Sequence, residues 1–176
     1  RQLDASRSRA TPLLDDLQDR LGSGIPPAGR TGIVHGDYRL DNALVVGAGD
    51  DPRVSAVLDW EMATLGDPLV DLGMLGLYWD IADLGDAAVP SAVDPAAGYA
   101  GFDELVDAYA AQAGIPVPDL RWYRAFAAYK LAVILEGIHF RYTAGETVGE
   151  GFDRMGALVE PLAETALRTA AAERTP

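Results

Sequence analysis

A run of polar side chains at residues 35–42 has the spacing expected of a phosphotransfer site. The segment reads HGDYRLDN, of the form H-x-D-x-x-x-x-N, and Asp59 follows Asn42 by 17 residues. Phosphoryl transfer needs a carboxylate that orients the acceptor hydroxyl and takes its proton, and oxygen ligands that hold Mg²⁺ on the phosphates. Asp37 fits the base, and Asn42 and Asp59 fit the ligands. The alternative is that all three are turn residues of a solvated loop.

Two short strands would bring the metal ligands together. Apolar runs at 43–46 and 54–58 flank a Gly/Asp-rich turn at 47–52, which predicts a β-hairpin. Asn42 and Asp59 then lie at the open ends of the two strands. Because those ends are adjacent in space, we expect the two side chains to share one ion.

A second motif, GDPLVDL at residues 66–72, leads into a predicted helix. Asp71 lies near the start of this helix, where a carboxylate can accept hydrogen bonds from backbone N–H groups of a neighbouring loop. We therefore expect Asp71 to brace the loop that carries Asp37. The alternative is a helix-start residue without that role. Asp41 and Glu61 are each expected to be solvated or paired locally, and the alternative is that they assist the metal or the substrate.

The rest of the chain is mainly helical. Apolar positions recur every three or four residues, with Pro, Gly or Asp at the boundaries. They predict helices at residues 12–21, 69–82, 102–113, 120–143 and 151–172, the last with a kink at Pro161. A brief strand is expected at 33–34 and a loop at 84–101. The predicted fold class is α+β, mainly helical, with a small β insertion near its start.

The segments HGDYRLDN, VLDWE and LGDPLVDL, in this order, resemble the signature of the aminoglycoside phosphotransferase and choline kinase superfamily. The resemblance is closest to phosphotransferase-like domains related to those fused to some acyl-CoA dehydrogenases. It implies a protein-kinase-like C-terminal lobe using ATP and Mg²⁺, with Asp37 as catalytic aspartate and Asn42 and Asp59 as magnesium ligands. It also implies that His35 is a structural residue of the catalytic loop and that Asp71 anchors this loop. Asp37, His35 and Asp71 are therefore grouped as the catalytic candidates.

The length of 176 residues predicts a single domain over residues 1–176. Within it we expect a helical lead-in at 1–31, a catalytic core at 32–83 and a helical substrate subdomain at 84–176.

The sequence lacks the parts of a kinase that hold most of the ATP. It has neither a G-x-G-x-x-G nor a G-x-x-x-x-G-K-[ST] motif, and its only lysine, Lys130, follows the catalytic loop instead of preceding it. Since the chain starts at Arg1, we expect a fragment that is inactive by itself and whose partner is the missing N-terminal lobe of the same protein. The alternative is a natural short protein that has lost ATP chemistry.

The composition of the chain limits the class of partner and the cellular location that we expect. The net charge of −13 repels phosphate backbones, which disfavours nucleic acid. The acidity either favours a cationic acceptor or only keeps the protein soluble. The absence of Cys fits a reducing cytoplasm, and Lys130 and Glu136 interrupt the longest apolar stretch, so we expect a cytoplasmic protein without a membrane segment.

The leading hypothesis is ATP-dependent phosphotransfer to a hydroxyl group of a small molecule, whose identity the sequence leaves open. One rival is a pseudokinase-like domain that binds a ligand or partner without catalysis. Another is a metal-dependent hydrolase using His35, Asp37, Asp59 and His139, although such sites usually contain more His and carboxylate ligands. Aromatic residues at helical spacing either line an acceptor pocket or belong to the core: Tyr78, Trp79, Trp122 and Tyr123.

Overall fold

The computed structural model describes residues 9–27, 29–47, 52–83, 93–147 and 151–171. These residues form two compact units. The first, called here the helical unit, contains α2 (Pro12–Ser23), α5 (Arg121–Thr143), α6 (Phe152–Met155) and α7 (Val159–Ala171). The second, called here the loop unit, contains four short strands with α3 (Leu69–Asp83) and α4 (Phe102–Ala113). The predicted lead-in helix thus groups with the C-terminal helices, and α4 groups with the strands.

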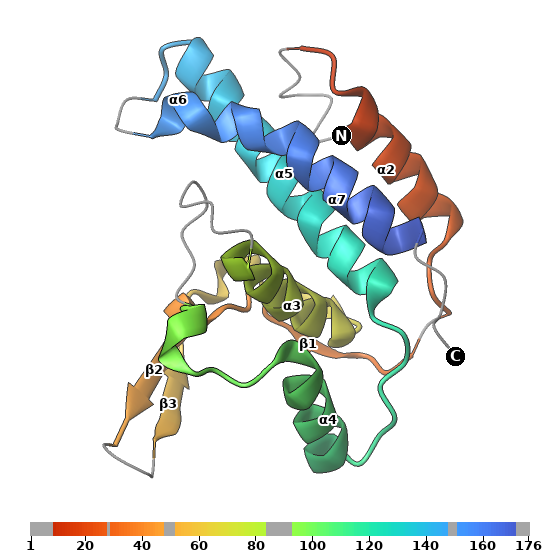
Figure 1. Ribbon diagram of the computed structural model, residues 1–176, viewed down its shortest axis with the longest axis vertical. Helices are drawn as coiled ribbons and strands as arrows, with labels where there is room; N and C mark the ends of the chain where they lie inside the picture. Colours follow the sequence, from red (N-terminus) through yellow and green to blue (C-terminus); the bar gives the residue numbers. More distant parts are fainter. Residues whose placement is uncertain (1–8, 28, 48–51, 84–92, 148–150, 172–176) are drawn as a thin grey trace. The chain divides into compact units, whose positions relative to one another are not determined.

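The helical unit packs small and aliphatic side chains between three helices. Helix α7 contacts both α5 and α2, and it runs between them in Figure 1. Helix α2 starts at Pro12, whose fixed φ suits a first helical position, and buries one leucine stripe. Alanines on α5 allow close approach of the neighbouring helices. The buried side chains include Leu14, Leu17, Leu21, Ala125, Ala128, Ala132, Leu135, Leu162 and Ala166.

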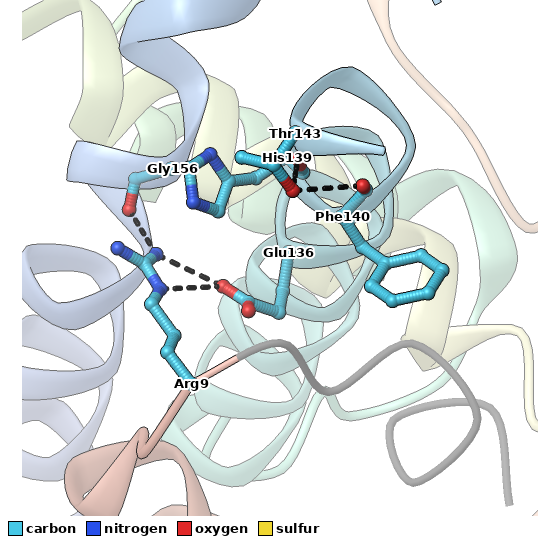
Figure 2. A network of polar contacts seen from close by, with 6 residues as sticks. All are labelled: Arg9, Glu136, His139, Phe140, Thr143 and Gly156. Atoms are coloured by element: carbon cyan, nitrogen blue, oxygen red, sulfur yellow. Dashed lines mark hydrogen bonds and ion pairs between the residues drawn. The ribbon is translucent and has the colours of Figure 1, made fainter. Parts of the chain in front are cut away.

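One buried carboxylate interrupts this apolar packing (Figure 2). Glu136 on α5 is 0% exposed, and its Oε2 accepts hydrogen bonds from Arg9 Nε and Nη2 at 3.1 and 2.9 Å. Arg9 Nη2 also donates to the carbonyl of Gly156, and the ring of His139 lies against Gly156. A buried charge needs a partner of opposite charge, so Arg9 ties its segment to α5.

The last predicted helix differs from the expectation. Instead of one kinked helix over 151–172, the chain forms α6, a 3₁₀ turn at Gly156–Leu158 and then α7. Pro161 lies in the first turn of α7, where its missing N–H removes no helical hydrogen bond. The irregularity therefore falls ahead of Pro161, as a break with a 3₁₀ turn. Residue 172 lies outside the described residues.

The loop unit contains two antiparallel strand pairs. Strand β1 (Gly32–Val34) pairs with β4 (Thr64–Gly66), and β2 (Ala43–Val46) pairs with β3 (Arg53–Val57). The second pair is the predicted hairpin, with a register shift between Leu44 and Val45. The sequence analysis did not predict β4. Part of the predicted turn, residues 48–51, lies outside the described residues.

Two helices complete the loop unit. The backbone N–H of Gly101 donates to Glu104 Oε2 at 2.8 Å at the start of α4, and Gly114, with φ 64°, ends it. Gly76 lets α4 approach α3, because a Cβ there would lie 2.6 Å from the ring of Phe102. The expected loop at 84–101 contains a 3₁₀ turn at Pro95–Ala97, and its first part, 84–92, lies outside the described residues. Within the described ranges, no helix is long and apolar enough to cross a membrane.

Candidate active site

The loop at 35–42 is fastened to α3 at its beginning. The Asp71 carboxylate accepts hydrogen bonds from the backbone N–H of His35 at 2.6 Å and of Gly36 at 2.9 Å. Asp71 can reach both groups because it lies in the first turn of α3. This contact is the one that the sequence predicts for Asp71. The catalytic importance of the contact stays a prediction.

Both ring nitrogens of His35 are used by the backbone. His35 is 2% exposed, and its Nδ1 accepts a hydrogen bond from the backbone N–H of Asp37 at 3.2 Å. Nε2 must then carry the ring proton, and it donates to the carbonyl of Leu58 at 2.7 Å. The imidazole links the loop to the residue before Asp59. It is a positioning residue, with no nitrogen left for a metal in this geometry.

Gly36 is required by the shape of the loop. Its φ of +88° lies in the left-handed region, which side chains other than Gly rarely adopt. A Cβ at this position would also lie 2.6 Å from the backbone carbonyl oxygen of Met62. The loop therefore approaches the segment after β3 too closely for any other residue.

Asn42 orients the Asp37 carboxylate. Its Nδ2 donates to the Asp37 carbonyl at 2.8 Å and to Asp37 Oδ2 at 3.2 Å. The amide nitrogen of Asn42 is thus turned toward Asp37, and the amide oxygen is the atom suited to a cation. The Asn42 amide nitrogen therefore fixes the Asp37 carboxylate, and its role as a metal ligand stays a prediction.

The hairpin places Asp59 at the same end as Asn42. Ala43 is paired with Val57, and the Leu58 N–H donates to the Asn42 carbonyl at 2.8 Å. Asp59 follows directly, in the left-handed conformation with φ 63° and ψ 59°. It is the one residue other than Gly with positive φ in the described part of the chain. Such strain is tolerated where the surroundings fix it, often at functional sites.

The donor set of Asn42 and Asp59 fits Mg²⁺. This ion prefers hard oxygen ligands, and it commonly takes one or two protein groups and completes its shell with water and substrate phosphates. A carboxylate and an amide oxygen at one end of a hairpin meet that requirement. Across the ranges that the structure describes, no three His, Asp or Glu side chains are grouped to hold a metal.

The sequence analysis missed an interaction between Arg39 and α3. Arg39 Nη1 donates to the hydroxyl oxygen of Tyr78 at 3.0 Å, and Arg39 Nε and Nη2 lie 2.8 and 2.7 Å from Asp41 Oδ2. Burial raises the pKa of the Tyr78 phenol; the Arg39 charge opposes this shift, and the Asp37 charge adds to it. The available signal was spacing, because residues seven apart share one helix face and Tyr78 follows Asp71 by seven.

The four aromatic candidates are divided between the two units. Tyr78 and Trp79 belong to the loop unit, and Trp122 and Tyr123 belong to the helical unit. Trp79 Nε1 donates to the Ala100 carbonyl at 3.0 Å, and Trp122 Nε1 donates to the Leu21 carbonyl at 3.1 Å. These contacts are structural ones, and Asp41 is paired locally with Arg39.

Comparisons with known proteins identify the family and the fold of the chain. Residues 1–126 match the family described as "Phosphotransferase enzyme family". The fold matches the crystal structure of a protein from Ralstonia eutropha JMP134 described as a putative aminoglycoside phosphotransferase, with a TM-score of 0.82 and 35% identity over 96% of this chain. The chain covers 52% of that protein. The architecture is thus the kinase-like α+β fold, mainly helical with small antiparallel strand pairs.

Two curated relatives are both acyl-CoA dehydrogenase family member 11, from different organisms. The protein from Mus musculus is 35% identical over 173 residues, and that from Gallus gallus is 32% identical over 174 residues. These matches cover 96% and 95% of this chain but 22% of each relative, so the chain spans about a fifth of their length. The chain belongs to the phosphotransferase enzyme family.

Proposed function

We propose that this chain is the catalytic lobe of a kinase that transfers the γ-phosphoryl group of ATP to a hydroxyl group of a small molecule. One arrangement carries the proposal. Asn42 holds the Asp37 carboxylate, while the backbone bond between Leu58 and Asn42 places Asp59 at the same end of the hairpin. The family and the fold support phosphotransfer in general, and the acceptor hydroxyl and the ATP are part of the proposal.

In this proposal Asp37 orients the acceptor hydroxyl and takes its proton as the oxygen attacks phosphorus. His35 and Asp71 act through the loop backbone and keep the carboxylate in place. Asn42 and Asp59 would hold Mg²⁺, which would supply positive charge to the phosphates. The acceptor is a hydroxyl-bearing small molecule, and the acidity of the chain makes cationic acceptors worth including in a screen.

We also propose that the complete protein supplies a nucleotide lobe from outside these 176 residues and works in the cytoplasm. The chain's only lysine, Lys130, lies on α5, and no glycine-rich phosphate motif is present. Apolar side chains are left uncovered on the first strand pair, where the cross-strand neighbours Ile33 and Leu65 are 68% and 76% exposed. A contiguous apolar surface of this kind suits a protein contact. The chain alone should therefore show little turnover.

The decisive experiment measures ADP formation from Mg·ATP by the complete reading frame against a panel of amino alcohols, sugars, hydroxy acids and aminoglycosides. Acceptor-dependent turnover is expected, and Asp37→Asn should lower it by about a hundredfold or more. Asp107→Asn, an exposed change on α4, is the matched control and should leave turnover unchanged. Unchanged turnover in Asp37→Asn would remove Asp37 from this role.

Binding of Mg·ATP without turnover on any acceptor would favour the pseudokinase-like alternative. In that case the 176-residue chain should gain binding of Mg·ATP when the nucleotide lobe is added, but it should gain no phosphotransfer. ATP-independent phosphatase activity of the same protein would instead revive the hydrolase hypothesis.

A further inference from the structure

The guanidinium group of Arg39 is close enough in the sequence to compete for the Asp37 carboxylate. Arg39 lies two residues after Asp37 in the same loop. Guanidinium groups bind carboxylates through two parallel hydrogen bonds, so an arginine this near would ordinarily pair with Asp37. Such a pair would occupy the oxygens that must accept the proton of the acceptor hydroxyl, and it would neutralise their charge.

The structure directs the guanidinium to two other groups. Arg39 Nε and Nη2 lie 2.8 and 2.7 Å from Asp41 Oδ2, and Nη1 donates to the Tyr78 hydroxyl oxygen at 3.0 Å. Arg39 Cζ also lies 4.4 Å from the centre of the Tyr78 ring, a cation–π distance. The Asp37 carboxylate accepts its hydrogen bond from the uncharged Asn42 amide instead.

Tyr78 binds the Arg39 guanidinium from a buried position on α3. It is 4% exposed and lies two turns after Asp71 on α3. Residues seven apart lie on one face of a helix. Two residues on the same face of α3 therefore bind the loop. Asp71 accepts hydrogen bonds from the backbone N–H groups of His35 and Gly36. Tyr78 accepts a hydrogen bond from the side chain of Arg39.

We propose that Asp41 and Tyr78 are positioning residues that keep the Arg39 guanidinium from pairing with Asp37. The idea rests on the proposed function, since it matters only if Asp37 receives a proton from the acceptor. Asp41 supplies the competing carboxylate, and Tyr78 supplies a buried acceptor together with an aromatic face. Nothing in this arrangement requires Arg39 to touch the substrate.

The first test needs no turnover and uses the 176-residue chain. Crystal structures are compared for the chain with its own sequence and for Asp41→Asn, which keeps the shape but removes the charge. We expect the guanidinium to swing to the Asp37 carboxylate in the variant. A guanidinium that stays on Tyr78 would overturn the proposal. If Asp41→Asn fails to fold, Tyr78→Phe tests the same point, because it removes the hydroxyl and keeps the ring.

The second test measures ADP release from Mg·ATP by the complete protein. Asp41→Asn should lower kcat about tenfold and leave the KM for ATP unchanged, because a misplaced charge at Asp37 affects the proton transfer. Adding Arg39→Gln should restore most of the lost kcat, since the competing guanidinium is gone. A double variant that is no faster than Asp41→Asn would overturn the proposal, because a merely structural pair is not repaired by losing its second member.

Matched controls separate these effects from general charge changes. Arg30→Gln combined with Asp107→Asn removes the same two charges from exposed positions of the loop unit, and it should leave kcat unchanged. The two proposals also fail differently. Full turnover in Asp37→Asn rejects the proposed function, whereas the position of the guanidinium in Asp41→Asn decides the positioning role by itself.

Discussion

The two units hold their buried polar groups in different ways. In the helical unit, Glu136 is held by the side chain of Arg9, 127 residues away in the sequence, and Arg9 also reaches the Gly156 carbonyl (Figure 2). In the loop unit, Asp71 and His35 bind backbone groups of the loop itself. A backbone partner is present whatever residue occupies the position, whereas a side-chain partner is lost by one substitution. The backbone at His35–Asp37 is therefore held whatever side chains it carries, provided that Asp71 and the His35 ring are kept.

The largest effect on stability is expected from removing the partner of the buried carboxylate. Arg9→Ala removes the two hydrogen bonds that Arg9 donates to the buried Glu136 carboxylate, which should lower the free energy of unfolding by about 3 kcal/mol. Urea denaturation followed by circular dichroism measures this loss. Arg168→Ala is the control, because its ion pair with Glu164 is exposed and should cost no more than about 0.5 kcal/mol. Equal losses in the two variants would show that the Arg9 pair contributes nothing special.

The next effect concerns the backbone of the loop unit. Gly36→Ala should lower the free energy of unfolding by about 2 kcal/mol and reduce turnover, because it meets both an unfavourable φ and the Met62 carbonyl. Gly98→Ala has a similar φ of +75° but nothing within 4 Å, and should cost only about 1 kcal/mol. The difference between the two measured losses isolates the clash. Identical losses would mean that the loop can move away from Met62.

The corresponding substitution in the helical unit, Gly156→Ala, should lower the free energy of unfolding by less, and a second substitution should recover the loss. A Cβ at Gly156 would lie 2.5 Å from His139 Nδ1, which is a side-chain atom, and Gly156 has helical φ. Gly156→Ala should therefore cost about 1 kcal/mol, through overpacking. Adding His139→Ala should recover this loss in a double-mutant cycle, since Nδ1 is buried and has no hydrogen-bond partner among the described residues. Strictly additive losses would contradict the contact. No side-chain substitution at Met62 can relieve Gly36→Ala, because the clash is with a backbone oxygen.

The smallest effect is a dependence of stability on alkaline pH. Burial raises the pKa of Tyr78 above its ordinary value near 10, so the unfolded chain loses the phenolic proton first as the pH rises. The folded state binds more protons in that range, and the contribution to stability that is complete below pH 10 is lost as the pH rises through the folded pKa. Unfolding measured from pH 8 to 11 should show a steeper decline for the native chain than for Tyr78→Phe. Equal declines in the free energy of unfolding of the two proteins would contradict the raised pKa of Tyr78.

Local patterns identified the hairpin and the brace from Asp71. Two apolar runs and a Gly/Asp-rich turn were enough to place Asn42 and Asp59 at one end, and the structure has that pairing. Strand β4 could not be found in this way. It has three residues, Thr64–Gly66, and it is a strand only because β1 pairs with it. The break before α7 was also missed, because the sequence shows Pro161 but does not show where the backbone departs from α-helical geometry.

Sequence alone predicted the phosphotransferase class, because the proposed base and the two proposed oxygen ligands are defined by residue type and by spacing within one short segment and the strand after it. The tertiary structure decided which groups hold them. The tautomer of His35 follows from the Leu58 carbonyl, and the direction of Arg39 follows from Tyr78. The burial of Glu136 is decided by helix packing and by Arg9. Each of these depends on residues brought together by folding, and a buried polar group is stable only where such a partner is present.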